Sequence, residues 1–139
     1  MRALQFAAAS KQLSILCLGA HSDDIEIGCG ATLLKMVELA VRVEVRWCVL
    51  SGAGGREAEA RASAMEFLSQ AAEADVEVMN FSDSVFPQHS EKIKAWFEEL
   101  KGRVDPDVIF THYRGDAHQD PREVCRLTWN TFRDHCILE

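Results

Sequence analysis

The sequence lacks any run of lysines and arginines, and its charge is acidic overall. With 15 Lys and Arg against 22 Asp and Glu, the formal net charge is −7 at pH 7. Proteins that bind a phosphate backbone need clustered basic side chains, so we expect no nucleic-acid partner. The apolar runs of the first twenty residues are short and are interrupted by Ser-Lys-Gln. We therefore expect neither a membrane span nor a cleaved signal.

Paired cysteine motifs are also missing. The five cysteines are odd in number, contain no Cys-x-x-Cys pair and mostly lie within apolar runs, as buried free thiols do. This usage favours a reducing compartment, and we expect a cytoplasmic protein. The 139 residues contain no repeat or linker, so residues 1–139 are expected to form a single domain. The sequence leaves open whether that domain forms a homo-oligomer.

Short apolar runs alternate with amphipathic segments along the chain. The runs predict strands at Leu13–Leu18, Val43–Leu50, Val76–Phe81 and Val108–His112, and the final "CILE" looks like the start of another. The amphipathic segments predict helices over Ala31–Leu39, Glu57–Ala72, Glu91–Leu100 and Arg122–His135. Strict alternation implies right-handed crossovers and an α/β fold with a mostly parallel sheet. In such sheets, ligands bind at the carboxyl ends of the strands.

The loop after the first predicted strand, "GAHSDDIE", carries the strongest chemical signal. His21 and Asp24 can aim an imidazole nitrogen and a carboxylate oxygen at one point, and zinc accepts both ligand types. Asp23 would then stand beside the metal without binding it. The alternative is that these acids are solvated, or that they cap a helix beginning near Gly28, whose N-terminal dipole favours anions.

The loop after the fourth predicted strand, "YRGDAHQDP", supplies a second cluster. It contains Asp116, His118 and Asp120, and His112 precedes it at the strand end. Because parallel strands end at the same edge, this loop is expected to lie beside the His21–Asp24 turn. For His112 we favour a packing role, whereas two clusters of metal-ligand residue types at one edge point to a shared site.

These residues carry a resemblance to a known family. "GAHSDDIEIGCGATLLKM" resembles the "PHPDDxE…GCGGT" signature of the LmbE/PIG-L-like family of metal-dependent sugar N-deacetylases, and "DAHQDPREV" resembles its second signature, "HxDH". The resemblance covers essentially the whole chain, as the N-terminal part of a family domain that normally runs on further. It implies a Rossmann-like three-layer sandwich, apparently shortened at its C-terminus.

Carried over residue by residue, the resemblance implies a zinc hydrolase. His21 and Asp24 would be metal ligands, Asp23 the general base, and His118 a transition-state stabiliser or acid. The implied substrate is a small molecule, an N-acetylated amino sugar or a conjugate of one. Such a reaction needs a nucleophile generated near pH 7 and a stabilised oxyanion, and a divalent metal helps with both.

Pro121 departs from the second signature. It stands where the family has a ligand histidine, and proline offers no side-chain donor. A site with two family ligands is expected to hold Zn²⁺, or another divalent metal, weakly, unless His118 or Asp120 completes the coordination. The sequence therefore leaves two interpretations: a deacetylase with an altered ligand set, and a catalytically impaired, metal-poor relative that acts as a binding module.

Two further loops are candidates for substrate contact. Arg56 lies in the Gly-rich "SGAGGRE", whose backbone N–H groups could hold an anion at a helix start, and Asp83 follows the third predicted strand. A flexible connection and a turn acid are the respective alternatives. The chain has neither the GK[ST] of a P-loop nor GxGxxG spacing, so a nucleotide-binding domain is disfavoured.

Overall fold

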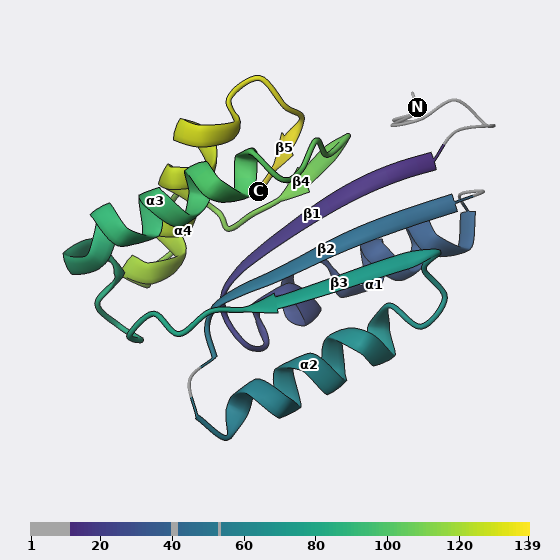
Figure 1. The fold of residues 1–139 in the computed structure, drawn as a ribbon, viewed down its shortest axis with the longest axis horizontal. Helices are drawn as coiled ribbons and strands as arrows, with labels where there is room; N and C mark the ends of the chain where they lie inside the picture. The colour runs from purple at the N-terminus through teal and green to yellow at the C-terminus, as the bar shows by residue number, and fades with distance from the viewer. Residues whose placement is uncertain (1–11, 40–41, 53) are drawn as a thin grey trace.

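The computed structural model describes residues 12–39, 42–52 and 54–139, and it contains one parallel five-stranded sheet (Figure 1). The strand order is β3-β2-β1-β4-β5. The strands are β1 (Gln12–His21), β2 (Arg42–Ser51), β3 (Glu73–Val78), β4 (Val108–Phe110) and β5 (Ile137–Leu138). The helices are α1 (Asp24–Leu39), α2 (Arg56–Phe67), α3 (Ser90–Lys101) and α4 (Gln119–Phe132), with a short 3-10 helix at Phe86–His89. The α/β class and the parallel sheet predicted from the alternation are confirmed.

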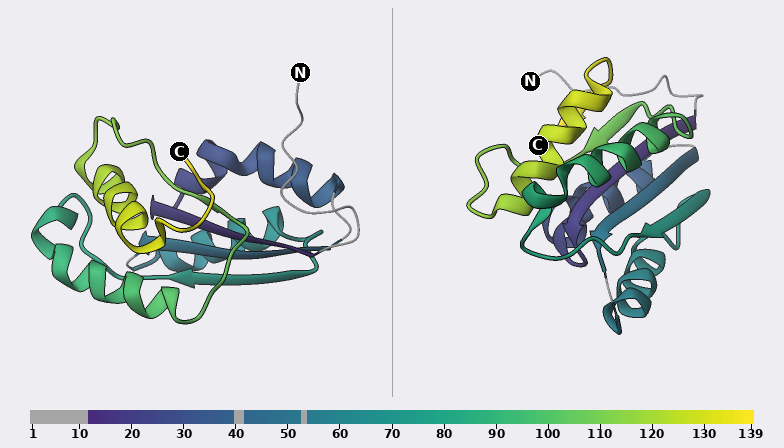
Figure 2. Two further views of the ribbon diagram at one scale, coloured as in Figure 1. Left: turned by 90° about the horizontal axis from the view of Figure 1, so that it is seen from above. Right: turned by 60° about the vertical axis from the view of Figure 1, so that its left-hand side comes forward.

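Helices cover both faces of the sheet, which makes three layers. Helices α1 and α2 lie on one face, and α3 and α4 lie on the other (Figure 2). Successive side chains of β1 point to opposite faces, so Leu16 and Leu18 pack toward α3 and α4 while Ile15 and Cys17 pack toward α1 and α2. Because both faces of β1 are buried against apolar clusters, its sequence is a continuous hydrophobic run.

Several predicted element boundaries are wrong. Helix α1 begins at Asp24 rather than Ala31, because Asp24 and Glu26 in its first turn favour the positive helix end and Ile27 N–H bonds to the Asp23 carbonyl. Helix α4 begins at Gln119 rather than Arg122, with Pro121 inside the first turn, where a missing N–H costs nothing. The acidic residues after His21 favour a loop at the start of α1, and Pro121 favours a helix boundary, so both patterns predict late helix starts.

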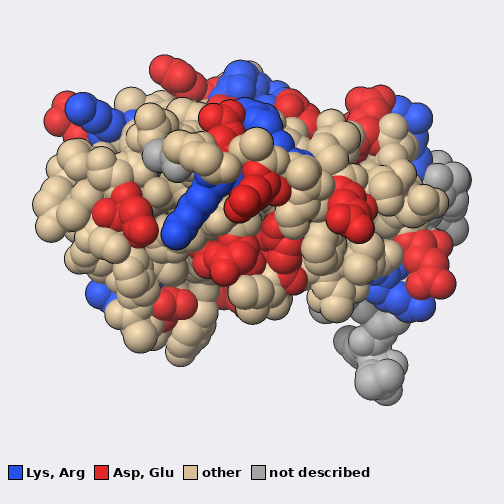
Figure 3. Space-filling model, turned by 90° about the horizontal axis from the view of Figure 1, so that it is seen from below, with Lys and Arg blue, Asp and Glu red and all other residues tan. Residues whose placement is uncertain are grey.

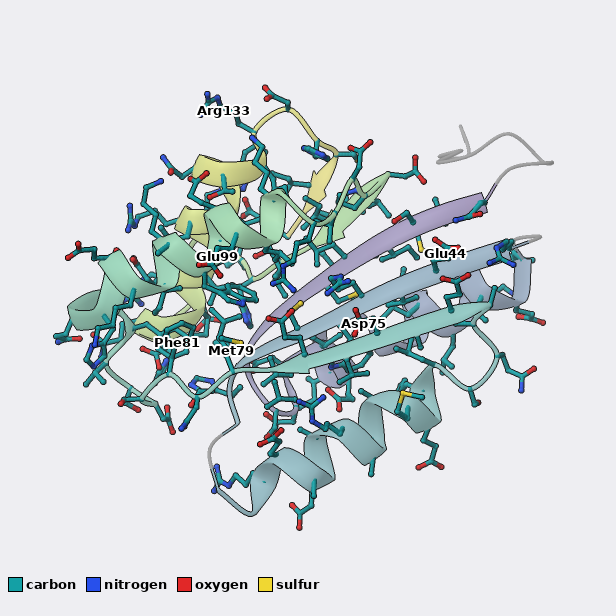
Figure 4. All side chains as sticks on the ribbon, viewed as in Figure 1. Glu44, Asp75, Met79, Phe81, Glu99 and Arg133 are labelled. Carbon is teal, nitrogen blue, oxygen red and sulfur yellow. The ribbon has the colours of Figure 1, made fainter. Side chains whose placement is uncertain are left out.

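The third predicted strand is displaced as well. Helix α2 ends at Phe67 rather than Ala72, and β3 covers Glu73–Val78 rather than Val76–Phe81. Met79 and Phe81 lie past the end of β3, in the connection toward α3 and α4 (Figure 4), and both pack against the apolar cluster of that face. Met79 and Phe81 are apolar because they pack against this cluster, and for that reason the apolar run predicts a strand that continues too far.

The carboxyl ends of the strands gather at one edge of the sheet. His21 ends β1 and is in register with Ser51, which ends β2. Helix α4 contacts both β1 and the 3-10 helix, so its first turn reaches the same edge. None of the helices in the described part of the chain is both long and apolar enough for a membrane crossing.

Candidate metal and catalytic site

The site is centred on the imidazole of His21, at the carboxyl end of β1. Its Nε2 lies 2.9 Å from Asp83 Oδ1 and 3.3 Å from Asp120 Oδ2. The ring of His118 meets it edge-on, with ring centroids 5.2 Å apart. The loops after β1, β3 and β4 therefore meet at one point, as the argument from parallel strand ends predicts.

Asp120 is fully buried and ties three segments together. Its Oδ2 accepts a hydrogen bond from the Ser84 N–H at 2.6 Å, and its Oδ1 accepts one from the Phe86 N–H at 3.0 Å. A buried carboxylate is costly unless it is paired and hydrogen-bonded, and these backbone donors and His21 meet that requirement. One side chain of α4 thus fixes both the loop after β3 and the histidine after β1.

His118 caps helix α4 with its own ring. Its Nδ1 accepts a hydrogen bond from the Asp120 N–H at 3.2 Å, and its backbone N–H donates to Asp116 Oδ1 at 2.7 Å. A neutral imidazole that accepts through Nδ1 carries its proton on Nε2. The cap therefore sets His118 as an N–H donor at Nε2.

Asp24 lies on the other side of the His21 ring. Its Oδ2 accepts the His21 backbone N–H at 2.7 Å and lies 3.6 Å from His21 Nδ1 and 3.3 Å from His112 Nε2. Burial raises the pKa of Asp24, but the contacts with His112 and with the His21 N–H outweigh it, and the net shift is downward. Asp24 is therefore a carboxylate at neutral pH, and it adjoins Nδ1 rather than Nε2 of His21.

His112 is half-buried and points to the β1 backbone, where its Nε2 accepts the Ala20 N–H at 2.8 Å. The same nitrogen lies 3.3 Å from Asp24 Oδ2, so His112 adjoins both the end of β1 and the first residue of α1. The packing role favoured from the sequence agrees with this position.

An open cavity of about 890 Å³ adjoins these side chains. Asp23, Arg56, Asp83 and Pro121 all line it, together with His21, Asp24, Asp116 and His118. The six residues given a role in metal binding, catalysis or substrate contact thus border one cavity, whereas Asp120, the alternative ligand, is buried behind it. Asp23 and Arg56 are exposed there, and Pro121 presents its ring where the family signature has a histidine.

Two features of the site had little signal in the sequence. Ser84 has a φ of 64°, the left-handed region that favours glycine, and no glycine or asparagine marks it. The contact of Asp83 with His21 joins residues from different loops, which spacing alone does not reveal. The hydrogen bond from the Ser84 hydroxyl lowers the pKa of Asp83, burial raises it, and His21 adds to the lowering; the net shift is downward, so the side chain is a carboxylate at neutral pH.

The donor set fits a divalent metal. Among the residues that the structure describes, one group of three or more His, Cys, Asp or Glu side chains brings its ligand atoms within 4.8 Å of one another: His21, His118 and Asp120. Imidazole nitrogen and carboxylate oxygen are zinc ligands. The group includes His21 and both residues expected to compensate for Pro121, while Asp24 and Asp83 lie outside it.

Comparison with protein families gives a match over most of the chain. Residues 16–132 match the PIG-L family, described as GlcNAc-PI de-N-acetylase. The chain is 32% identical over 124 residues to an uncharacterized deacetylase, YaiS, of Escherichia coli K12. That alignment covers 82% of this chain and 65% of YaiS, so the chain spans about two thirds of the relative's length.

Solved structures share the fold at lower identity. An N,N'-diacetylchitobiose deacetylase from Pyrococcus horikoshii matches with a TM-score of 0.62 and 20% identity, over 86% of this chain and 49% of that one. GalB from Pseudomonas putida KT2440, a 4-carboxy-2-hydroxymuconate hydratase, matches with a TM-score of 0.68 and 20% identity, over 86% and 55%. The LmbE-like architecture is thereby confirmed.

Replacing Asp120 by alanine tests its structural role. The Asp120→Ala variant leaves the Ser84 and Phe86 N–H groups without an acceptor, and each buried donor left unpaired costs about 1–3 kcal/mol. We expect the free energy of unfolding, measured by urea denaturation with a chelator present, to fall by about 2–4 kcal/mol. Glu66→Ala, at an exposed position of α2, is the control and should change it by less than about 0.5 kcal/mol. An equal loss of free energy of unfolding in the two variants would contradict the structural role of Asp120.

Proposed function

This chain belongs to the GlcNAc-PI de-N-acetylase family, and on that premise we propose that the protein is a metal-dependent hydrolase that removes an N-acetyl group from an amino sugar or sugar conjugate. The observation that carries the proposal is the convergence of His21, His118 and Asp120 at the edge of an open cavity. The similarity to YaiS and to the Pyrococcus horikoshii deacetylase, both described as deacetylases, supports the proposal.

The proposed metal is Zn²⁺, or another divalent cation, held by His21 together with Asp120. The family resemblance implies Asp24 as a ligand as well. In the structure Asp24 adjoins the other ring nitrogen of His21, Nδ1, and its carboxylate accepts the His21 backbone N–H, so we assign it the role of fixing the turn. When bound, the cation polarises the amide carbonyl and makes water a stronger nucleophile near pH 7.

Asp23 is proposed as the general base. Its carboxylate is exposed and lines the cavity next to His21, so a water in the cavity can reach it. It takes the proton from the attacking water and later passes it to the departing amine. A positioned carboxylate of this kind contributes about 10²–10⁴-fold to the rate.

His118 is proposed to stabilise the oxyanion or to protonate the leaving nitrogen. The helix cap at its Nδ1 leaves the Nε2–H as a donor, and the ring borders the same cavity as Asp23. A donor fixed before the reaction loses no free energy to reorientation when charge develops on the substrate oxygen.

The charged side chains that line the cavity indicate the charge of the substrate. Among the described residues that line the cavity, Arg56, the first residue of α2, is the one arginine, whereas five are acidic: Asp23, Asp24, Glu59, Asp83 and Asp116. Acidic side chains also gather on the face of the molecule seen in Figure 3. This balance favours an uncharged amino sugar over a phosphorylated one, with Arg56 donating to a sugar oxygen. Asp83 would contact a sugar hydroxyl, or the metal.

A second candidate follows from Pro121. The proline ring borders the cavity without a donor atom, and this favours a weakly metallated relative that binds a sugar without hydrolysing it. GalB, whose fold is similar, is a hydratase, so the fold itself does not require deacetylation. All five cysteines are free in the structure, which is consistent with the cytoplasmic location predicted for either function.

The assigned roles separate metal binding from catalysis. His21→Ala and Asp24→Ala should lower bound zinc, measured by elemental analysis after dialysis, because one removes a donor and the other releases the turn. Asp23→Asn should retain zinc while acetate release from N-acetylglucosamine compounds falls by at least about 100-fold. Equal zinc loss in all three variants would contradict the separate roles.

Restoring the family residue tests the significance of Pro121. Pro121→His adds a donor at the edge of the cavity, so we expect zinc affinity and acetate release to increase together, with affinity rising at least about 10-fold. The first-turn position of α4 tolerates a non-proline residue. Titration with zinc and the acetate assay on the same preparation measure both. Higher zinc affinity without any acetate release would favour the binding module.

A further inference from the structure

One ring nitrogen of His21 faces two carboxylates. Asp83 Oδ1 lies 2.9 Å and Asp120 Oδ2 lies 3.3 Å from His21 Nε2. A ring nitrogen carries at most one proton, so it can serve one of these oxygens well and not both. Imidazole nitrogen and carboxylate oxygen are both ligand types that suit a divalent cation, and His21 Nε2 has a carboxylate oxygen from each of two loops beside it.

Helix α4 supplies fewer donors than the family signature requires. Pro121 offers none, and His118 accepts the Asp120 N–H through Nδ1, which leaves a proton on Nε2. Binding a metal through Nε2 would move that proton to Nδ1, where it would face the Asp120 N–H and break the helix cap. Within α4, Asp120 is therefore the donor that is ready to bind.

We propose that Asp83, in the loop after β3, is a metal ligand in this chain and supplies the donor that is missing at Pro121. The inference rests on the proposed function, since it concerns the metal of the same site. The ligand set is then His21 Nε2, Asp120 and Asp83, with His118 kept as the N–H donor to the substrate.

The loop that carries Asp83 is held from α4. The Ser84 N–H donates to Asp120 Oδ2 at 2.6 Å, and the Gln119 side-chain amide donates to the Ser84 carbonyl. These bonds hold Ser84 at its φ of 64°, a conformation that a serine keeps only when its surroundings impose it. Asp83 is thus fixed toward His21 by two adjacent residues of the family's second signature.

The position of Asp83 also leaves its carboxylate accessible to a metal ion. Its side chain is 58% exposed, so it loses little hydration on approaching a cation, and its recorded partners are His21 and the adjacent Ser84 hydroxyl. Because Asp83 and Pro121 border the same cavity from different elements, a donor lost from α4 can be replaced from the loop after β3 without moving the sheet.

Zinc titration of four variants tests this assignment without any activity measurement. Asp83→Ala should weaken zinc binding by more than about 100-fold, because ligand loss exceeds the 10–100-fold cost of losing an outer partner. Glu59→Ala removes an acid from the same cavity, on α2, and should change the affinity by less than about 3-fold, because exposed charges are screened. Circular dichroism should show that both variants fold.

The double variant separates a ligand from a merely structural residue. If Asp83 replaces the missing donor, Asp83→Ala should cost at least about 10-fold less zinc affinity in a Pro121→His background than in the unsubstituted chain, because the two donors are alternatives. Equal losses for Asp83→Ala and Glu59→Ala, or the same loss in both backgrounds, overturn the assignment and leave the proposed function standing. Failure of the unsubstituted chain to bind zinc overturns both.

Discussion

The buried carboxylate of Asp120 is the interaction on which the site depends. It lies in the first turn of α4, yet its two oxygens are used by the backbone of Ser84 and Phe86 and by the ring of His21. A carboxylate this deeply buried is stable only while all of its partners are in place. The geometry of the three loops is therefore coupled: displacing one of them leaves a charge or a backbone N–H unpaired.

The parallel sheet makes that coupling available. His21 and Asp120 are 99 residues apart in sequence, but they meet because β1 and β4 are adjacent and end at the same edge. The two apolar clusters on either side of the sheet hold α1 and α4 in place. The side chains proposed to be catalytic thus lie on turns whose positions are set by packed elements, which would limit their reorganisation during a reaction.

The sequence was sufficient for the fold class and for the meeting of the first and fourth loops, since hydrophobic runs and strand polarity determine both. The start of α1 is harder to predict from the sequence, because Gly28 and Gly30 weaken the helical pattern after Asp24. The contact of Asp83 with His21 required the structure. It depends on the left-handed conformation of Ser84, which is imposed by Gln119 and Asp120 rather than by local sequence.

We propose that the metal of this protein binds at His21 Nε2, between carboxylates of two loops. Anomalous diffraction at the zinc edge from crystals grown with zinc tests it directly. We predict one strong peak within bonding distance of His21 Nε2, Asp120 and Asp83. A peak that instead contacts Asp24 and His118 while leaving Asp83 free, or no peak at His21, would contradict the account.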